Sequence, residues 1–143
     1  MRILDAFKLL ADLCAGQTDL AGRPYIEHPV RVYLRVCELG GDRDQQFAAL
    51  FHDVIEDGRA TAEQLLEAGV PAGAVRLVLV LTRKKGQPYL VYIQGIKEEP
   101  RAVLPKQADL EDNSDPARLA MLDEATASRL RQKYAQAREL LAA

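Results

Sequence analysis

The sequence predicts an all-α protein of about seven or eight helices joined by short connections. Three observations indicate this class: apolar residues recur at helical spacing along the chain, capping patterns precede two of the apolar segments, and no apolar run has a partner strand elsewhere. At 143 residues the chain has the length of one ordinary domain. We therefore expect a single domain over residues 1–143.

A stretch that contains glycines, at residues 16–22, separates the first two expected helices. The spacing of apolar residues predicts the first helix over residues 3–15. The second is expected over residues 24–39, because proline is tolerated in the first turn of a helix and Pro24 stands there. Pro29 lies inside that segment, so we expect a kink or a broken first turn at this position.

Two capping-box patterns predict the starts of the next two helices. Asp42 precedes Gln45, and Thr61 precedes Gln64, at the spacing that a capping box requires. The apolar run over residues 75–82 contains β-branched residues that also permit a strand, but without a partner strand we expect a buried helix. Further helices are expected from Tyr89, from Pro100 towards Asn113, and over roughly residues 126–142.

The composition argues against several classes of function. Nineteen lysines and arginines against twenty-one acidic residues give a formal charge of −2, which argues against a broad cationic surface for duplex nucleic acid. No run of about 18 apolar residues is present, so no membrane span is expected. The charges of Asp5 and Lys8 argue against a signal peptide. We expect a cytoplasmic protein in which Cys14 and Cys37 stay reduced.

One short segment, Phe51-His-Asp-Val-Ile-Glu-Asp57, combines an imidazole with three carboxylates. Residues four apart share one face of a helix, so we expect His52 over Glu56 and Asp53 over Asp57 on the helix that follows the first capping box. Burying these groups beside apolar neighbours costs free energy unless a cation compensates them. The segment therefore predicts half of a metal site.

The other half must come from distant parts of the chain. The sequence contains two histidines, and His28 lies near the start of the second expected helix. A divalent transition metal binds neutral imidazole nitrogens and carboxylate oxygens that converge from separate elements. Asp109 is a candidate for the distant carboxylate, although its segment also fits a solvated acidic helix end.

Four blocks of sequence occur in order: Gly-x-Pro-Tyr-Ile-x-His-Pro, Ala-Ala-Leu-x-His-Asp-Val-Ile-Glu-Asp, Leu-Thr-Arg and Ala-Asp-Leu-x-Asp-Asn. They stand at residues 22–29, 48–57, 81–83 and 108–113. Their order resembles the HD-domain metal phosphohydrolases and, more narrowly, the (p)ppGpp hydrolase domain of RelA/SpoT homologues. Among these, the single-domain small alarmone hydrolases are similar in size, and the resemblance covers most of the chain.

The resemblance implies an HD-domain helical bundle and a role for particular residues. It implies that one divalent ion, usually Mn²⁺, is held by His28, His52, Asp53 and Asp109. It further implies that Glu56 and Asp57 are the catalytic acidic pair and that Asn113 contacts the nucleoside part of the substrate. Mixed imidazole and carboxylate ligands also fit Fe, Co or Zn, so the residues leave the metal open.

The chain departs from the family pattern where a basic pair usually precedes the first metal-binding histidine. Asp19 and Leu20 stand at those positions, and neither stacks on a purine as a guanidinium does. Cys14 stands where the family commonly has a histidine, and Asp115 where the longer enzymes often have a basic residue. The expected contacts to guanine at positions 19 and 20 are therefore absent from this sequence.

Substrate phosphates require cationic partners. Arg23 and Lys106 are the candidates that lie in the motif regions, whereas Lys84 and Lys85 fit a solvated loop.

We therefore expect a metal-dependent hydrolase of a phosphorylated nucleotide, with ppGpp 3′-pyrophosphohydrolase activity or a close relative of it as the leading function. An HD-type nucleotidase or phosphodiesterase that acts on another small phosphoester is the alternative enzyme. A metal-binding regulatory domain without turnover is the alternative outside enzymes, although the presence of both Glu56 and Asp57 favours catalysis. The expected partner is a small-molecule nucleotide, and the sequence does not predict an oligomeric state.

Overall fold

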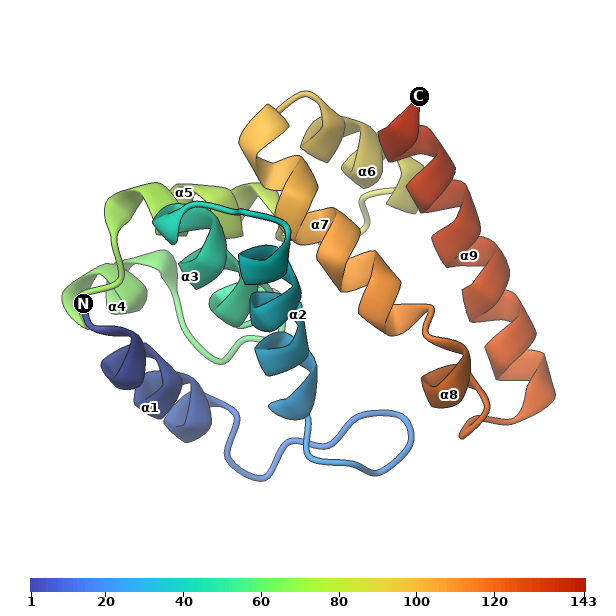
Figure 1. Cartoon of the computed structure of the whole chain (residues 1–143), viewed down its shortest axis with the longest axis horizontal. Coiled ribbons are helices and arrows are strands. Elements are labelled where there is room, and N and C mark those ends of the chain that lie inside the picture. Colours follow the sequence, from blue (N-terminus) through green and yellow to red (C-terminus); the bar gives the residue numbers. More distant parts are fainter.

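The computed structural model describes residues 1–143 and confirms the all-α class (Figure 1). Its helices are α1 (Ile3–Leu13), α2 (Glu27–Glu38), α3 (Arg43–Phe51), α4 (Ala62–Glu67), α5 (Ala72–Val80), α6 (Tyr89–Lys97), α7 (Pro100–Asn113), α8 (Pro116–Leu119) and α9 (Glu124–Ala142). None of them combines the length and the apolar composition needed to span a lipid bilayer.

Both expected capping boxes are confirmed. The Asp42 carboxylate accepts a hydrogen bond from the Gln45 amide at 3.0 Å, and the Gln45 side chain accepts one from the Asp42 amide at 3.0 Å. Thr61 and Gln64 make the same reciprocal pair at 3.1 and 2.9 Å. These bonds satisfy backbone donors that the first turn of a helix leaves free, and so they set the starts of α3 and α4.

The expected start of the second helix at residue 24 was wrong. Pro24 instead forms an isolated bridge with Thr18, and the Tyr25 amide donates to the Gln17 carbonyl at 2.9 Å. These bonds keep residues 16–26 in a loop, and α2 begins at Glu27. Pro29 therefore falls in the first turn of α2, where a missing amide hydrogen costs no hydrogen bond.

The helix that carries the His52-Asp53 pair also ends earlier than expected. α3 stops at Phe51, and residues 52–58 form a series of turns. The chain winds more tightly there, because the Val54 amide bonds the Phe51 carbonyl, three residues back, at 3.1 Å. Gly58, with φ at 70°, closes the series in the left-handed conformation that favours glycine. The expected regular helix over residues 52–57 was therefore wrong, although the Asp57 amide still bonds the Asp53 carbonyl, four residues back, at 2.9 Å.

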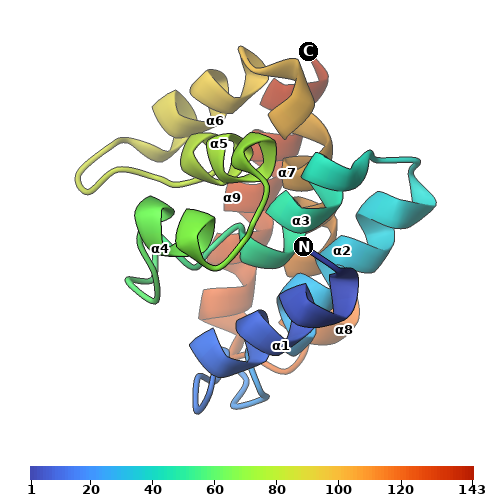
Figure 2. The ribbon, with the colours of Figure 1, turned by 90° about the vertical axis from the view of Figure 1, so that its left-hand side faces the viewer.

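α7 lies between two pairs of helices. It contacts α2 and α3 on one side and α6 and α9 on the other (Figure 1). Figure 2 shows α3 in the middle of the molecule, where it packs against α1, α2 and α5. Its last five residues are buried, as part of a main apolar core of 23 buried residues and a smaller cluster beside it. This packing brings together the start of α2, the end of α3 and the middle of α7.

One helix was not predicted, so the structure holds nine helices where about seven or eight were expected. α8 contains four residues, which is too short for an apolar period to be visible. Asp115 caps it, because its side chain accepts a hydrogen bond from the Ala117 amide at 2.9 Å, and Pro116 fits its first turn. α8 matters for the site because it carries Arg118.

The capping carboxylate of Asp42 should stabilise the protein, because it starts the helix whose buried residues lead to His52. We expect Asp42→Ala to lower the free energy of unfolding by about 1–2 kcal/mol in chemical denaturation, through loss of the bond to the Gln45 amide. Asp44→Ala is the control, since it removes a carboxylate from the same turn but no capping bond. An equal loss in both variants would contradict a capping role.

Candidate metal centre and catalytic cleft

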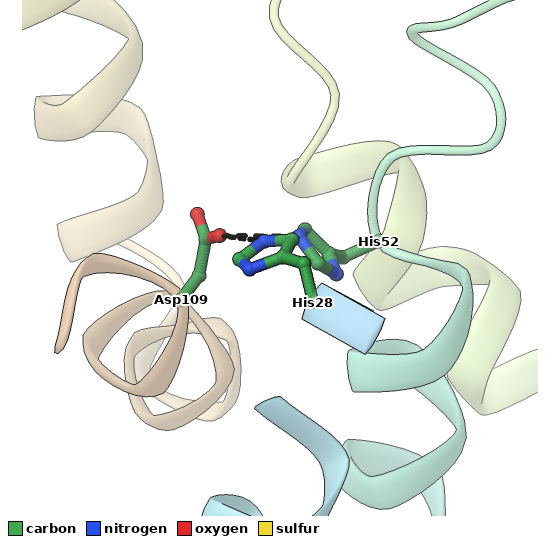
Figure 3. A group of neighbouring side chains, drawn as sticks. All are labelled: His28, His52 and Asp109. Carbon is green, nitrogen blue, oxygen red and sulfur yellow. Dashed lines mark hydrogen bonds and ion pairs between the residues drawn. The ribbon is translucent and has the colours of Figure 1, made fainter. Parts of the chain in front are cut away.

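Two imidazoles and one carboxylate converge between α2, α3 and α7 (Figure 3). Nε2 of His28 lies 2.9 Å from Oδ1 of Asp109, and Nε2 of His52 lies 3.2 Å from the same oxygen. One potential ligand atom from each residue lies within 4.8 Å of the other two. The three residues are only 3%, 3% and 4% exposed. They form a candidate site for a divalent ion.

The fold directs the same ring nitrogen of each histidine towards Asp109. His28 is the second residue of α2, and His52 directly follows α3. Nδ1 of His52 lies 2.7 Å from the carbonyl oxygen of Ala49. A carbonyl oxygen only accepts, so Nδ1 carries a proton. In the neutral ring Nε2 then keeps its lone pair for a metal.

Asp53 stands beside the cluster formed by His28, His52 and Asp109. Its Oδ2 lies 3.3 Å from Nε2 of His52 and accepts a hydrogen bond from the Tyr25 hydroxyl at 2.7 Å. Burial raises the pKa of Asp53, but His52 outweighs burial and lowers the pKa to about 2. The carboxylate is therefore charged at neutral pH. Its role as a fourth ligand stays a prediction.

Opposite charges hold the cluster together. Burial lowers the pKa of both histidines, but the neighbouring carboxylates outweigh burial and raise both values above the ordinary one. Burial acts in the opposite direction on Asp109 and raises the pKa of this carboxyl group. Lys106 and the two imidazoles outweigh burial and hold the pKa well below its ordinary value. A divalent cation can take the place of the imidazole protons as the partner of these carboxylates. The nitrogen and oxygen donors fit Mn, Fe, Co or Zn.

Lys106, one of the two cations expected to bind substrate phosphates, lies against Asp109. It is 8% exposed, and its Nζ donates to Oδ2 of Asp109 at 2.8 Å. The same Nζ lies 5.1 Å from the centre of the Tyr92 ring. Burial lowers the pKa of Lys106, but Asp109 outweighs burial and raises it well above its ordinary value. Much of the Lys106 charge is therefore used to hold Asp109.

The expected catalytic acids line a cavity of about 600 Å³ that His28, Asp53 and Asp109 also line. Oε1 of Glu56 accepts a hydrogen bond from the Arg83 backbone amide at 2.6 Å. Oδ2 of Asp57 accepts one from the Gln17 side chain at 3.1 Å. Burial raises the pKa of both carboxyl groups. Neither acid belongs to the three-residue cluster, so both are available to a molecule in the cavity.

The other two expected substrate contacts also line the cavity. Nδ2 of Asn113 donates to Oδ1 of Asp109 at 3.1 Å, so this amide already orients a residue of the cluster. Arg23 pairs with Glu27 through two hydrogen bonds of 3.1 and 2.8 Å. Lys84 and Lys85 are exposed and lie outside the cavity lining, as expected for a solvated loop.

The loop before α2 uses Asp19 for its own structure. Oδ1 of Asp19 accepts hydrogen bonds from the Ala21 and Arg23 amides, both at 2.9 Å. Oδ2 lies 3.6 Å from a guanidinium nitrogen of Arg118. Leu20 is 74% exposed and lines the cavity, whereas Cys14 is buried in the apolar core. Asp19 and Leu20 stand where the family usually has a basic pair. In the cavity wall they thus place a carboxylate that holds the loop and an apolar side chain.

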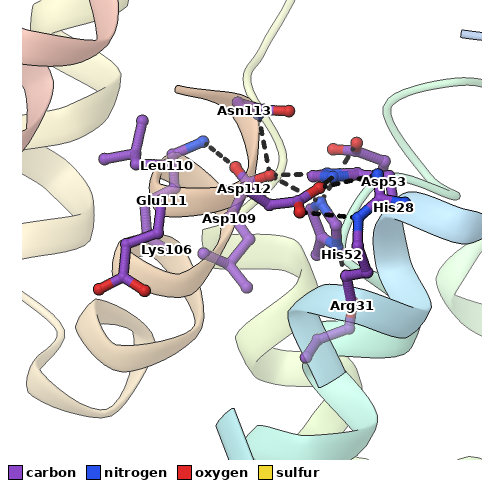
Figure 4. Close-up of polar contacts among 12 residues, drawn as sticks. His28, Arg31, His52, Asp53, Lys106, Asp109, Leu110, Glu111, Asp112 and Asn113 are labelled. Carbon is purple, nitrogen blue, oxygen red and sulfur yellow. Dashed lines mark hydrogen bonds and ion pairs between the residues drawn. The ribbon is translucent and has the colours of Figure 1, made fainter. Parts of the chain in front are cut away.

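Sequence reasoning missed a further carboxylate at the cluster. Oδ2 of Asp112 lies 2.6 Å from Nδ1 of His28, on the side of the ring that faces away from Asp109 (Figure 4). Arg31 donates to Oδ1 of Asp112 at 2.8 Å, and Arg118 donates to Oδ2 at 2.9 Å. Burial raises the pKa of Asp112, but His28 and Arg31 outweigh it and lower the pKa to about 2. The available signal was weak: Asp112 lies one helical turn after Asp109.

A family model described as "HD domain" matches residues 6–143 of this chain. The chain belongs to the HD-domain family. The matched segment includes the cluster of His28, His52 and Asp109, the acidic pair and every residue that lines the cavity.

Several curated relatives of this HD-domain chain are named as ppGpp hydrolases. A guanosine-3′,5′-bis(diphosphate) 3′-pyrophosphohydrolase from Aquifex aeolicus is 31% identical over 76% of this chain and 16% of the relative. The bifunctional (p)ppGpp synthase/hydrolase SpoT from Escherichia coli is 34% identical over 78% of this chain and 17% of the relative. The chain therefore spans less than a fifth of the length of these relatives.

A solved structure shares the fold of this HD-domain chain. It was described as a metazoan ortholog of SpoT that hydrolyses ppGpp. The two structures align with a TM-score of 0.79 and 22% sequence identity, over 96% of this chain and 84% of that chain. The alignment confirms the helical HD-domain fold.

Metal binding to this HD-domain chain should weaken as the pH falls. Carboxylates raise the pKa of His28 and His52 above the ordinary value of about 6.5, so protons compete with a metal already above that pH. Above the raised pKa the imidazoles are neutral and can bind, and below it they are protonated. Titrations with Mn²⁺ between roughly pH 5 and pH 8 measure the affinity. An affinity that does not change over this range would contradict two histidine ligands.

Asp112 should orient His28 for metal binding. We expect Asp112→Ala to weaken Mn²⁺ binding by about 10- to 100-fold in calorimetry, because the ring loses the partner of its Nδ1. Asp112→Asn, which keeps an acceptor oxygen, should lose less. Glu111→Ala is the control, because this neighbouring acid of α7 pairs with Arg35 instead of a histidine. Equal affinities in Asp112→Ala and Glu111→Ala would rule out the orienting role.

Proposed function

We propose that residues 1–143 act as a metal-dependent phosphohydrolase that removes diphosphate from guanosine 3′,5′-bis(diphosphate) or a close relative of it. The observation that carries the proposal is the cluster of His28, His52 and Asp109, two members of which, His28 and Asp109, line one cavity together with Glu56 and Asp57. The names of the curated relatives that match this region support the same activity.

The proposed metal ligands are His28, His52, Asp53 and Asp109, and the proposed ion is Mn²⁺. Two imidazole nitrogens and two carboxylates suit a divalent transition metal, and the geometry of His28, His52 and Asp109 fits one ion. When bound, the ion polarises a phosphoryl oxygen and lowers the pKa of a water molecule. Lys106 and Asn113 hold the Asp109 carboxylate in place through hydrogen bonds of 2.8 and 3.1 Å.

Glu56 and Asp57 are proposed to handle the proton of the attacking water. A carboxyl group whose pKa is raised towards neutral pH is a stronger general base than an ordinary one, and burial raises the pKa of both. One carboxylate accepts the proton as the water oxygen bonds to phosphorus. The bond from phosphorus to the nucleoside oxygen then breaks, and that oxygen takes up a proton as it leaves.

The cavity suits a nucleotide in size and in lining. Its volume of about 600 Å³ lies within the range of small-molecule sites. Its lining includes apolar side chains that can contact a base, namely Leu20, Leu119, Met121 and Leu122. Arg23 and Asn113 are proposed to contact the substrate from the same cavity.

A second candidate is an HD-type nucleotidase or phosphodiesterase that acts on another small phosphoester. Asp19 favours this alternative, because a carboxylate replaces a basic residue at a position where the family pattern recognises guanine. Arg118 lies 3.6 Å from Asp19, so this carboxylate repels a phosphate less strongly than an unpaired carboxylate would. A regulatory domain that binds metal without turnover remains the third function to be tested.

A phosphate and pyrophosphate release screen across nucleotides, with Mn²⁺ and with EDTA, separates these functions. We expect pyrophosphate release from ppGpp that depends on Mn²⁺. Release from another phosphoester alone would favour the second candidate, and metal binding without any release would favour the regulatory one.

Two sets of substitutions then separate chemistry from metal binding. We expect Glu56→Gln with Asp57→Asn to slow hydrolysis by about 10²- to 10⁴-fold, because the proton acceptors are lost, while metal analysis still finds about one ion per chain. His52→Ala should lose the ion as well. Loss of the fold or of the metal in the amide variant would point to a structural role for the acidic pair, and circular dichroism is the check on folding.

A further inference from the structure

Most of the cations that line the cavity already face a carboxylate. The pairs, with their shortest distances, are Arg23 with Glu27 at 2.8 Å, Arg31 with Asp112 at 2.8 Å, Lys106 with Asp109 at 2.8 Å and Arg118 with Asp112 at 2.9 Å. Arg31, Lys106 and Arg118 thereby stabilise the site itself and have little charge left for a substrate phosphate, whereas Arg23 shares its charge with Glu27 in an exposed pair.

Two cations of the cavity wall have no such partner. Arg83 follows α5, Lys133 lies on α9, and neither makes an ion pair with a carboxylate. Both pack on the ring of Tyr89, which begins α6, with Arg83 at 5.5 Å and Lys133 at 4.4 Å from the ring centre. The three side chains therefore form one group in the cavity lining. The helices that carry Tyr89 and Lys133, α6 and α9, lie side by side (Figure 1).

This group has an electrostatic cost that the protein offsets only in part, through the Tyr89 ring and through a hydrogen bond of 2.8 Å from Nε of Arg83 to the Gln87 carbonyl. Arg83 and Lys133 are both half-buried, and a half-buried cation without a counter-charge is less stable than a solvated one. Burial, together with the positive charges of Arg83 and Lys106, lowers the pKa of Lys133. The Tyr89 hydroxyl is buried and has no hydrogen-bond partner. An anion at this wall would offset the charges and supply an acceptor for polar groups that now lack one.

We propose that Arg83, Lys133 and Tyr89 form a second anion subsite, which binds the phosphate or diphosphate of the substrate that is not hydrolysed. The inference rests on the proposed function, because it assumes that another phosphate of the same nucleotide reaches the metal cluster. Arg83 links the subsite to the chemistry, since its backbone amide donates to Glu56 at 2.6 Å. The preferred substrate is then a nucleotide with phosphate groups at two separate positions.

Two substrates that differ in one group test this subsite. The first is ppGpp, and the second is guanosine with a 3′-diphosphate and a free 5′ hydroxyl. We expect Lys133→Gln and Arg83→Gln each to raise the KM for ppGpp by roughly tenfold, and to leave the KM for the second substrate unchanged. Lys84→Gln is the control, because Lys84 neighbours Arg83 but lies outside the cavity lining. Equal effects on both substrates, or no effect on either, would overturn the proposal.

The melting temperature, Tm, distinguishes a structural role of Lys133 from a role in the anion subsite. If Lys133 serves only the fold, Lys133→Gln should lower Tm. If it serves the subsite, Tm should stay the same or rise, because the substitution removes repulsion from Arg83 and Lys106. A lowered Tm together with an unchanged KM for ppGpp would assign Lys133 to the fold.

Failure of the proposed function is distinguishable from failure of the subsite. If the wild-type protein hydrolyses neither guanosine nucleotide, the proposed activity is wrong, and calorimetry with inorganic pyrophosphate on the Mn²⁺-loaded protein decides the subsite. We expect Arg83→Gln with Lys133→Gln to bind pyrophosphate roughly tenfold more weakly than the wild type. Equal affinity in this double variant and the wild type would rule the subsite out.

Discussion

The carboxylate of Asp109 joins the helices that build the site. One of its oxygens meets a histidine from α2 and a histidine from the end of α3, at 2.9 and 3.2 Å, and the other accepts from Lys106 at 2.8 Å. Because the carboxylate is 4% exposed, it requires these partners or a bound cation to remain charged. The packing of α7 against α2 and α3 and the arrangement of the cluster therefore depend on each other.

Local regularities in the sequence predicted the helices well, because helical spacing and capping act over a few residues. Asp42 and Thr61 cap α3 and α4 as expected, and the apolar run that also permitted a strand is the helix α5. The errors arose where a non-local contact decides the outcome. Pro24 pairs with Thr18 instead of starting a helix, and a four-residue helix such as α8 has no period to detect.

The candidate site was predictable to the extent that its residues stand in recognisable blocks. Of the four expected ligands, His28, His52 and Asp109 come together within 4.8 Å, and Asp53 lies next to His52. The bond between Asp112 and His28 was not predictable, because 84 residues separate the partners and no spacing encodes their contact. The sequence also could not show that Lys106 forms an ion pair with Asp109, whereas other cations of the cavity have no carboxylate partner, because only the packed structure shows these pairs.

The bond between Glu56 and the loop after α5 has a consequence for how this site can diversify. The donor is the backbone amide of Arg83, not its side chain, so any residue except proline can hold the acid in place. A substitution at this position can therefore change the part of a ligand that the side chain contacts without removing the bond to Glu56. Substitutions in this loop can therefore change which substrate is preferred while Glu56 stays in place for the chemical step.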